Sequence, residues 1–313
     1  GCPMIHFLPL LLVFLPFVPA LISFALPDRM AVWRDVTNIS FALIKLGLVG
    51  FLLLAAREGV ITEWRYEFLP GHDFILRADS IALLFVTLSA FLWLITTVFA
   101  IGYFGRGPHL ARFFGFFNLC VLAATGVAMS GTTITFFLFY ELLTLATWPL
   151  VVHRGDEKSL RAGRIYLIYT LAGSAAYLAG IVWLSSLVGR VEFTAPPDLS
   201  GIPRLELTLI FILCIGGLGV KAALIPFHGW LPEAMAAPAP VSALLHAVAV
   251  VKAGAFGILR IIYDVFGIET VSDLGLATPL AMLAGATILY GSFRALMQND
   301  IKKRLAYSTV SQV

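Results

Sequence analysis

The chain has 313 residues, of which 60% are hydrophobic and only 12% are charged, with a net charge of +3. A soluble domain carries about 25% charged residues, so this composition excludes a water-soluble globular fold and indicates a protein dissolved in lipid. The three cysteines have no paired spacing, which predicts neither a disulfide framework nor a metal site. No basic patch or glycine-rich phosphate loop points to nucleic acid or to a bound cofactor.

Apolar runs long enough to cross a bilayer recur along the whole chain. A hydrocarbon core about 30 Å thick requires about 20 apolar residues of helix. Because every backbone polar group in lipid needs an internal partner, these runs predict an all-α polytopic transmembrane helical bundle. We expect nine full spans and the start of a tenth near Leu305; the full spans cover residues 5–26, 36–56, 79–104, 111–129, 132–152, 162–188, 205–225, 241–263 and 278–297.

The ends of the chain and one loop carry their own signals. The first apolar run is too long for a signal peptide and lacks a clear cleavage site, so we expect it to be a true span. Residues 61–77 combine aromatic side chains with Pro70-Gly71, which predicts a short hairpin resting on the membrane surface. The chain stops at Val313 without a polar tail, as expected of a C-terminally truncated piece of a longer protein.

The distribution of basic residues predicts how the spans are oriented. If the N-terminus lies outside, five Lys and Arg residues fall in outside loops and eleven fall inside. Because cytoplasmic loops are enriched in Lys and Arg, we expect a multi-pass protein of the bacterial inner membrane with its N-terminus on the outer, periplasmic side. The eleven inside residues are Arg29, Arg34, Arg106, Arg112, Arg154, Lys158, Arg161, Arg164, Lys302, Lys303 and Arg304.

A cluster of prolines predicts a broken helix near residues 222–240. Pro226 removes one helical donor, and its ring would clash with the carbonyl of Ala222. We therefore expect the seventh span to break, with an irregular segment and a short helix around 231–237 after it. Irregular backbone at membrane depth is tolerated only where protein or water covers it, and broken helices commonly surround ion sites.

Several ionisable residues lie where the chain should cross the hydrocarbon. Glu141 is near the middle of the fifth span, Lys221 precedes the break, His228 follows it, and His246 and Lys252 belong to the eighth span. A charge at mid-bilayer costs about 2.5–3.5 kcal/mol, so such residues are candidates for function. A neighbouring carboxylate helps a buried amine to keep its proton, and histidine titrates near neutral pH. The series predicts a water-linked path for lateral proton transfer.

Each of these residues also has a structural alternative. Glu141 and Lys221 as a static ion pair would fix helix packing without moving protons. Lys252 would snorkel to a surface, and His246 would be a hydrogen-bonded packing residue. His228 would pair with carbonyl groups freed by the break.

Three further charged residues receive structural interpretations. Lys45, in the second span, has no obvious acidic partner, so we expect a structural or snorkelling role. Asp79 and Arg260 lie near the ends of spans, and we interpret both as interfacial.

The segment around the break resembles a known family signature. Residues 219–254 read GVKAALIPFHGWLPEAMAAPAPVSALLHAVAVVKAG, which closely resembles the signature of the proton-translocating antiporter-like subunits. These occur in NADH:quinone oxidoreductase (respiratory complex I), in Mrp-type sodium/proton antiporters and in membrane-bound hydrogenases. Phe139-Tyr140-Glu141 and residues 299–312 resemble two further family landmarks, and the likeness extends over residues 79–313.

The resemblance implies a fold and a division of the chain. Family members have about fourteen helices around two inverted five-helix repeats, each with a broken helix. On this pattern, residues 1–104 are leading helices 1–3, residues 105–264 form the first proton-channel repeat, and residues 265–313 begin a second repeat. The chain most resembles the D-type subunits of Mrp-type antiporters, with an M-like membrane-arm chain of complex I, or a hydrogenase subunit, as the alternative.

The resemblance also implies roles for individual residues. It pairs Glu141 with Lys221, lets Lys252 carry the proton toward the second repeat, and matches His246 to a helix-eight histidine of the family. It implies protons as cargo, other membrane subunits as partners and no nucleic acid. It leaves open whether sodium passes through this chain.

Three other functions are alternatives to that of a proton-translocating subunit. A redox enzyme is disfavoured because the sequence has no facing pair of haem histidines, no cysteine cluster and no dinucleotide loop, so neither a redox nor a hydrolytic site is predicted. A stand-alone solute carrier would work without partner subunits, whereas the resemblance implies that this chain depends on them. A purely structural scaffold is disfavoured because buried charge is costly without a use.

Overall fold

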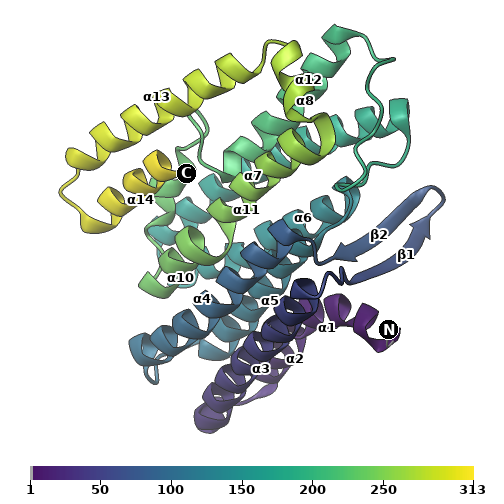
Figure 1. Cartoon of the computed structure of the whole chain (residues 1–313). Coiled ribbons are helices and arrows are strands. Elements are labelled where there is room, and N and C mark those ends of the chain that lie inside the picture. The colour runs from purple at the N-terminus through teal and green to yellow at the C-terminus, as the bar shows by residue number, and fades with distance from the viewer. Residues whose placement is uncertain (1–2) are drawn as a thin grey trace.

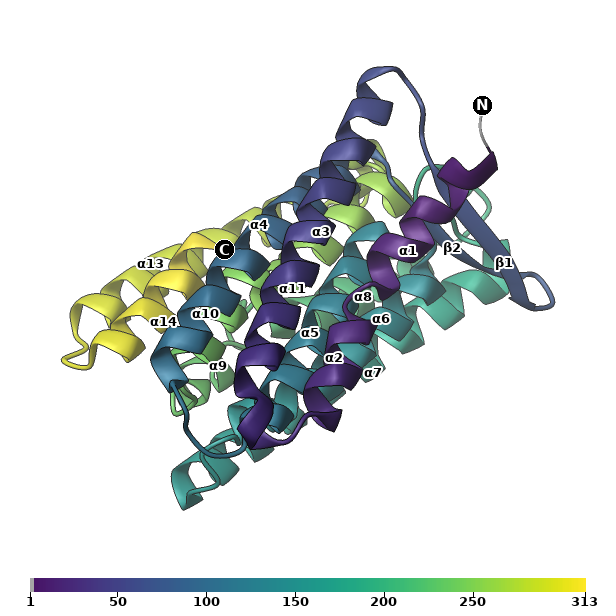
Figure 2. The same ribbon diagram turned by 90° about the horizontal axis from the view of Figure 1, so that it is seen from below.

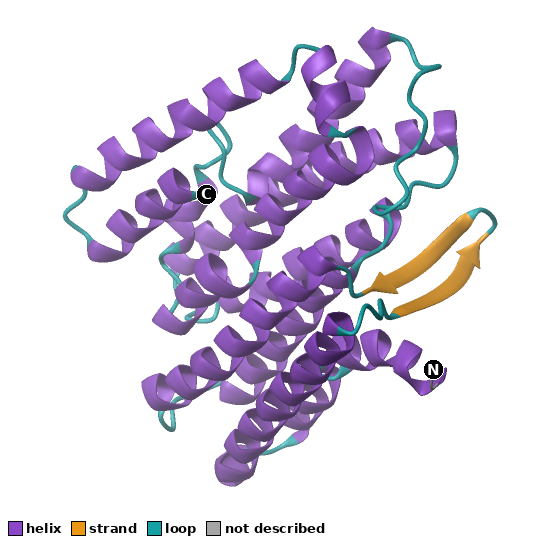
Figure 3. Ribbon diagram, viewed as in Figure 1, coloured by secondary structure: helices purple, strands orange, loops and turns teal. Residues whose placement is uncertain are grey.

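The computed structural model describes residues 3–313, which form a helical bundle with one two-stranded hairpin at an edge (Figure 1; Figure 3). Eight helical stretches are long and apolar enough to cross a membrane, which confirms the polytopic helical fold. The elements are η1 (Pro3–Phe7), α1 (Leu8–Phe14), α2 (Phe17–Ala25), η2 (Asp28–Met30), α3 (Ala31–Arg57), β1 (Glu63–Leu69), β2 (His72–Arg77), α4 (Ser80–Phe104), α5 (Leu110–Met129), α6 (Thr133–Val151), α7 (Glu157–Val188), α8 (Arg204–Lys221), α9 (Trp230–Ala234), α10 (Ala239–Ala243), η3 (Leu244–Val248), α11 (Val250–Arg260), η4 (Ile261–Phe266), α12 (Ile268–Asp273), α13 (Ala277–Leu296) and α14 (Ile301–Gln312).

Two of the expected spans differ from the structure in detail. The expected span over 205–225 corresponds to α8, which ends at Lys221 after 18 residues and carries three charged side chains, so it is not among the eight. The first span, expected as one helix, is divided between α1 and α2, with Pro16 at the N-cap of α2. Proline has no N–H to donate, so a break at this position follows from its chemistry.

The hairpin predicted within 61–77 is present. β1 and β2 pair antiparallel from Glu63 opposite Arg77 to Leu69 opposite His72. Gly71 has a φ of +77°, a conformation that glycine adopts without strain, and it closes the turn. The hairpin lies beside the N-terminal helices at one end of the bundle (Figure 1).

Charged side chains attach this hairpin to the loop before α8. Arg65 is 2.9 Å from a carboxylate oxygen of both Asp73 and Glu192, and Arg77 reaches Glu192 at 3.2 Å. Partial burial opposes ionisation of the Glu192 carboxyl, but hydrogen bonds from Arg65 and Arg77 outweigh it and lower the pKa of this group. The end of the bundle that carries the hairpin is therefore held by ion pairs.

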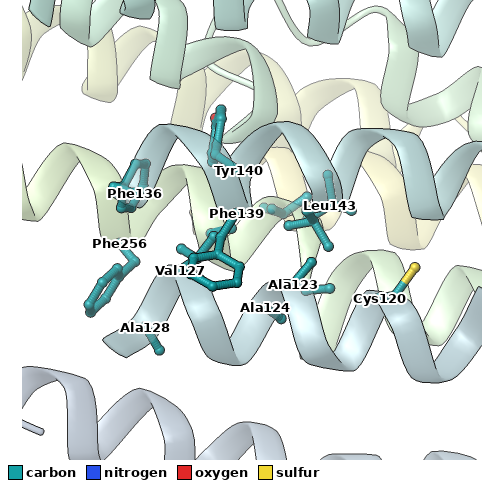
Figure 4. Close-up of a cluster of buried hydrophobic side chains, with 14 of the residues drawn as sticks. Cys120, Ala123, Ala124, Val127, Ala128, Phe136, Phe139, Tyr140, Leu143 and Phe256 are labelled. Atoms are coloured by element: carbon teal, nitrogen blue, oxygen red, sulfur yellow. The ribbon is translucent and has the colours of Figure 1, made fainter. Parts of the chain in front are cut away.

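Small residues allow the central helices to approach closely. A Cβ on Gly173 of α7 would lie 2.7 Å from the carbonyl oxygen of Gly217 on α8. At the α5–α6 interface, Phe139 and Leu143 lie against small α5 side chains such as Ala123 (Figure 4). Tyr140, on the same helix as Phe139, points away from α5 (Figure 4). This packing places Tyr140 on the side of α6 that bears the candidate site.

The predicted break after the seventh span is confirmed. α8 ends at Lys221, Ala223 has a φ of +60°, the Ile225–Pro226 peptide is cis, and the short helix α9 begins at Trp230. The Nε1 of Trp230 donates to the carbonyl oxygen of Val220 at 2.6 Å, in addition to the backbone hydrogen bond that this carbonyl accepts from Ala223 at 3.1 Å.

The eighth span is also interrupted, although its sequence predicts a continuous helix. Instead of one helix over 241–263, the chain forms α10, the π-helical η3, α11 and the π-helical η4. Ala249, between η3 and α11, has a non-helical φ and ψ of −132° and −81°. Such π-helical segments often occur at functional sites, and His246 lies within η3.

The last two helices pack beside each other at one edge of the bundle (Figure 2). α14 is the expected tenth helix and begins at Ile301, where Asp300 caps it through the backbone N–H of Lys302. Gly291 of α13 permits the contact, because a Cβ there would lie 2.9 Å from the carbonyl oxygen of Tyr307.

Candidate functional site

Lys221 is a buried amine at the break. Its side chain is 1% exposed, and its Nζ donates to the carbonyl oxygen of Tyr140 at 2.6 Å. The same Nζ lies 3.7 Å from the centroid of the Tyr140 ring, a cation–π geometry. The Thr144 hydroxyl also donates to the Tyr140 carbonyl, at 3.5 Å. Helix α6 therefore holds the end of the Lys221 side chain through its backbone and one aromatic ring.

Glu141 is next to that contact but is not paired with Lys221. It follows Tyr140 directly on α6 and is half-buried. Among the ion pairs of residues 3–313, none joins Glu141 to Lys221 within 4.0 Å. The structure thus brings Lys221 to the same turn of α6 as Glu141, without a direct bond between amine and carboxylate.

Two buried tyrosine hydroxyls lie on the helices next to the break. The hydroxyls of Tyr140 and Tyr166 are buried and have no hydrogen-bond partner. Tyr166, on α7, also packs its ring 5.5 Å from the ring of Trp230 in the break. Buried polar groups in native proteins are normally hydrogen-bonded, and a water molecule usually serves where no protein group does. The region between α6, α7 and the break therefore has the polar lining that internal water requires.

Helix α11 meets α8 at the Lys221 backbone. A Cβ on Gly254 would lie 2.9 Å from the carbonyl carbon of Lys221 and 3.0 Å from the Cα of Ala222. Lys252, two residues before Gly254, is half-buried on the same helix. The structure therefore brings the helix that carries Lys252 directly against the end of the helix that carries Lys221.

The two candidate histidines have different neighbours. His246 is part-buried, with its Nε2 3.5 Å from the sulfur of Met235. The ring of His228 packs 5.0 Å from the ring of Tyr290 on α13, with the two planes at 66°. In both histidines the Nδ1 atom is buried and has no partner. Pro226 is exposed, and its contribution is to the backbone geometry of the break.

Helices α13 and α14 cover the break and satisfy its backbone. The Thr287 hydroxyl accepts from the backbone N–H of Ile225 at 3.3 Å. The Lys302 amine donates to the carbonyl oxygens of Met235 and Ala237 at 3.2 and 2.6 Å. The sequence indicates Lys302 only as a loop charge that orients the chain, and nothing in its position shows that it reaches the break.

Arg260 and Lys45, for which the sequence predicts structural roles, both have side chains in the protein interior. Arg260 is 2% exposed, and its guanidinium is 2.6 Å from Asp79 and 2.9 Å from Asp264, so it is a buried partner of two carboxylates at the end of α11. Lys45 is 0% exposed and donates to the Thr125 hydroxyl, so it does not snorkel to a surface. In both cases the side chain lies deeper in the protein interior than the sequence position suggests.

Comparisons with known proteins agree with this architecture. The family described as NADH:quinone oxidoreductase/Mrp antiporter, TM matches residues 130–313. The chain is 33% identical to the A/B subunit of a probable K(+)/H(+) antiporter of Rhizobium meliloti (strain 1021), over 96% of this chain and 30% of that protein. It is 32% identical to NADH-quinone oxidoreductase subunit N of Desulforudis audaxviator (strain MP104C), over 98% of this chain and 62% of that protein. It is also 32% identical to hydrogenase-4 component B of Escherichia coli (strain K12), over 77% of this chain and 36% of that protein.

Solved structures share the fold. A chain of the archaeal membrane-bound sulfane sulfur reductase matches with a TM-score of 0.84 at 22% identity, over 97% of this chain and 62% of that chain. A chain of the Mrp complex from Dietzia sp. DQ12-45-1b matches with a TM-score of 0.83 at 25% identity, over 97% of this chain and 33% of that chain. The chain thus spans less than two thirds of the length of each of these relatives. It is a polytopic membrane protein, and it belongs to the NADH:quinone oxidoreductase/Mrp antiporter transmembrane family.

Proposed function

We propose that this chain translocates protons as a membrane subunit of a multisubunit ion-pumping complex, with the D-type subunit of an Mrp-type monovalent cation/proton antiporter as the first candidate. One observation carries the proposal: the Lys221 amine is buried at a helix break, and it is bound to the Tyr140 carbonyl rather than to a carboxylate. A static buried ion pair would join its two charges directly, whereas a proton carrier has to change its charge.

The proton step uses the groups around that amine. Glu141 lies one residue from the carbonyl that holds Lys221, so a change in its charge acts on the amine at short range. Water bound to the unpartnered hydroxyls of Tyr140 and Tyr166 would link the carboxylate to the amine. A proton then moves by transfer to the lone pair of the Lys221 nitrogen, and the amine releases it again without any redox change.

The onward path runs along the eighth span. The contact of Gly254 with the end of α8 brings α11, which carries Lys252, against the backbone of Lys221, and His246 lies in η3, which precedes α11. The histidine has one buried, unpartnered ring nitrogen, which is free to bind water or a proton. On this proposal residues 105–264 form one proton-channel repeat, residues 1–104 precede it, and residues 265–313 begin the next.

Transport by the whole complex in inverted membrane vesicles tests the proposal. We expect the Glu141→Gln, Lys221→Met and Lys252→Met variants to lose at least about tenfold in proton-transport rate, as for loss of a proton-transfer group. Glu58→Gln and Lys158→Met are matched controls, because both side chains are exposed in loops or at a helix end. A native gel should show the complex assembled in every variant. Wild-type transport by assembled Glu141→Gln or Lys221→Met would refute the mechanism.

A second candidate is a proton-pumping, M-like membrane-arm subunit of an NADH:quinone oxidoreductase, or a subunit of a membrane-bound hydrogenase. It is kept because relatives of nearly equal identity carry the names NADH-quinone oxidoreductase subunit N and hydrogenase-4 component B. An affinity tag on the chromosomal copy would identify the subunits that co-purify. Cation/proton antiporter subunits would support the first candidate, and quinone-reducing or hydrogenase subunits would support the second.

We place the chain in the bacterial inner membrane with its N-terminus on the periplasmic side. The eleven basic residues assigned to inside loops support this orientation. Single cysteines at exposed positions in a Cys2→Ser background provide the test, since the native Cys120 and Cys214 are buried. A membrane-impermeant thiol reagent should label Glu67→Cys in intact spheroplasts and Lys158→Cys only after lysis. The reverse pattern would invert the orientation.

A further inference from the structure

A second buried polar stripe lies on α3, outside the region around Lys221. Arg34, Asn38 and Lys45 are 2%, 0% and 0% exposed, although this helix crosses the membrane near the N-terminus. Their spacing of four and seven residues places them on one face of the helix. Polar groups on a buried face are costly in lipid unless they have partners or a function.

Helix α5 meets this stripe at two levels. The amide nitrogen Nδ2 of Asn118 donates to Oδ1 of Asn38 at 3.0 Å, and the Lys45 amine donates to the hydroxyl of Thr125. Asn38 and Lys45 are seven residues apart, as are Asn118 and Thr125, so both pairs are separated by two turns, or about 10 Å. The two helices therefore share a polar seam that runs along the bundle axis.

Helix α4 carries a row of polar groups that lack partners and that reaches Lys45 at Trp93. Ser89 Oγ, Trp93 Nε1 and Thr97 Oγ1 are all buried without a hydrogen-bond partner. They lie four residues apart and so occupy one face of α4, and the Lys45 amine is 5.1 Å from the Trp93 ring centroid. Unpartnered polar atoms in a row are the usual sites of internal water.

No carboxylate neutralises Lys45 within the described residues. Helices α1, α2, α4 and α5 contain no Asp or Glu, and the only acid on α3 is Asp35, which pairs with Arg34 at 3.9 Å. The remaining titratable groups of the facing helices are Cys120 and Arg112 on α5 and Tyr103 on α4. Cys120 bonds instead to Thr147 of α6. A permanent ammonium ion here would be desolvated without a carboxylate counter-ion, which is costly.

We propose that Lys45 is a second proton-binding site, fed by a file of water molecules between α3, α4 and α5. The lone pair of the neutral Lys45 nitrogen accepts one proton, and the ammonium ion formed is stabilised by the Thr125 hydroxyl and the Trp93 ring. It returns the proton to the same water file, so no other atom or electron is exchanged. The inference rests on the proposed proton transport but concerns a separate group of helices.

Two substitutions at one position distinguish proton binding from a static role. Arginine at position 45 stays charged at all working pH values and stacks well on aromatic rings, whereas methionine is never charged. If Lys45 must change its charge, both Lys45→Arg and Lys45→Met lose at least about tenfold in vesicle proton transport while the complex stays assembled. Full activity of Lys45→Arg alone would show that a fixed positive charge is sufficient. Full activity of both Lys45→Arg and Lys45→Met would show that the side chain only fills space. Either outcome overturns the inference.

If the Lys45 variants do not assemble into the complex, a double variant that leaves Lys45 in place tests the same proposal. Ser89→Ala combined with Thr97→Val removes two unpartnered hydroxyls, a change that leaves stability equal or higher. Transport should still fall several-fold, while Thr87→Val, on the partly buried side of α4, stays at the wild-type rate. Wild-type transport by the double variant would overturn the water file.

Lys221→Met, measured in parallel, separates this inference from the proposed function. Loss of transport with Lys221→Met but not with the Lys45 variants defeats the second site alone. Loss with the Lys45 variants but not with Lys221→Met defeats the proposed path through Lys221 alone.

Discussion

Gly254 lies against Ala222, with no room for a side chain between the two backbones. A Cβ on Gly254 would fall 3.0 Å from the Ala222 Cα and closer still to its backbone nitrogen. Backbone atoms cannot move aside as the end of a flexible side chain can. This contact fixes how α11 approaches the end of α8, and with it the relative positions of the segments that carry Lys221 and Lys252.

Enlarging Gly254 should therefore separate these two segments. We expect Gly254→Ala to destabilise the chain by about 1–3 kcal/mol, as overpacking does, and to slow proton transport more than the loss of folded protein explains. Gly216→Ala is the matched control, because no atom lies within 4 Å of a Cβ placed there. Thermal unfolding in detergent and vesicle transport measure the two effects. Equal behaviour of the two variants would contradict the role of the contact.

The ion pair between Arg260 and Asp79 should be essential for stability. Removing one partner of a buried pair leaves an uncompensated charge, and typically costs about 3–5 kcal/mol. We expect Arg260→Met to lower the unfolding temperature strongly, since it strands Asp79 and Asp264 together. Arg204→Met, at an exposed position, should change it little. Adding Asp79→Asn to Arg260→Met should recover part of the loss; no recovery would show that the two side chains are not coupled.

His153, in the loop after α6, should make the protein sensitive to mild acid. Partial burial, followed by the nearby positive charges of Arg112 and Arg154, lowers the pKa of His153 from 6.5 to about 4. Between these values the unfolded chain binds a proton that the folded chain does not, so stability falls as the pH drops from 6.5 toward 4.

Replacing this histidine should remove that part of the pH dependence. We expect the unfolding temperature of His153→Phe to fall less than that of the wild type when the pH is lowered from about 7.5 to about 5. The ring is retained, and with it the packing against Phe104 and Phe113 at 5.5 and 5.3 Å. Exposed His6, changed to Phe, is the control, because His109 itself helps to lower the pKa of His153. A pH dependence unchanged by His153→Phe would show that other groups cause it.

Local chemistry explains why much of the fold was predictable. Pro70-Gly71 between aromatic residues indicated the hairpin, and Pro226 indicated the break, because these residues restrict the backbone wherever they occur. The long apolar runs located the spans for a similar reason, since lipid leaves the backbone no other partner than itself. These features depend on a few neighbouring residues, so one sequence is sufficient to predict them.

The sequence predicted which residues belong to the candidate site, but not how their side chains contact one another. Arg260 and Asp79 are 181 positions apart, and no periodicity indicates that they meet. Likewise, the position of Lys221 in the chain does not reveal that its amine binds the Tyr140 carbonyl rather than Glu141. The π-helical turn that contains His246 has no proline to mark it, because it arises from packing between helices. Such contacts depend on tertiary structure.

The length of α7 has a consequence for how the molecule meets the water beside the membrane. Its 32 residues extend for about 48 Å at the usual rise, against about 30 Å of hydrocarbon. Immersing it fully would require a tilt of about 50°, outside the observed range for membrane helices. The helix must therefore extend beyond the hydrocarbon, and its first two turns, with Lys158, Arg161 and Arg164, form a cationic projection among the lipid headgroups.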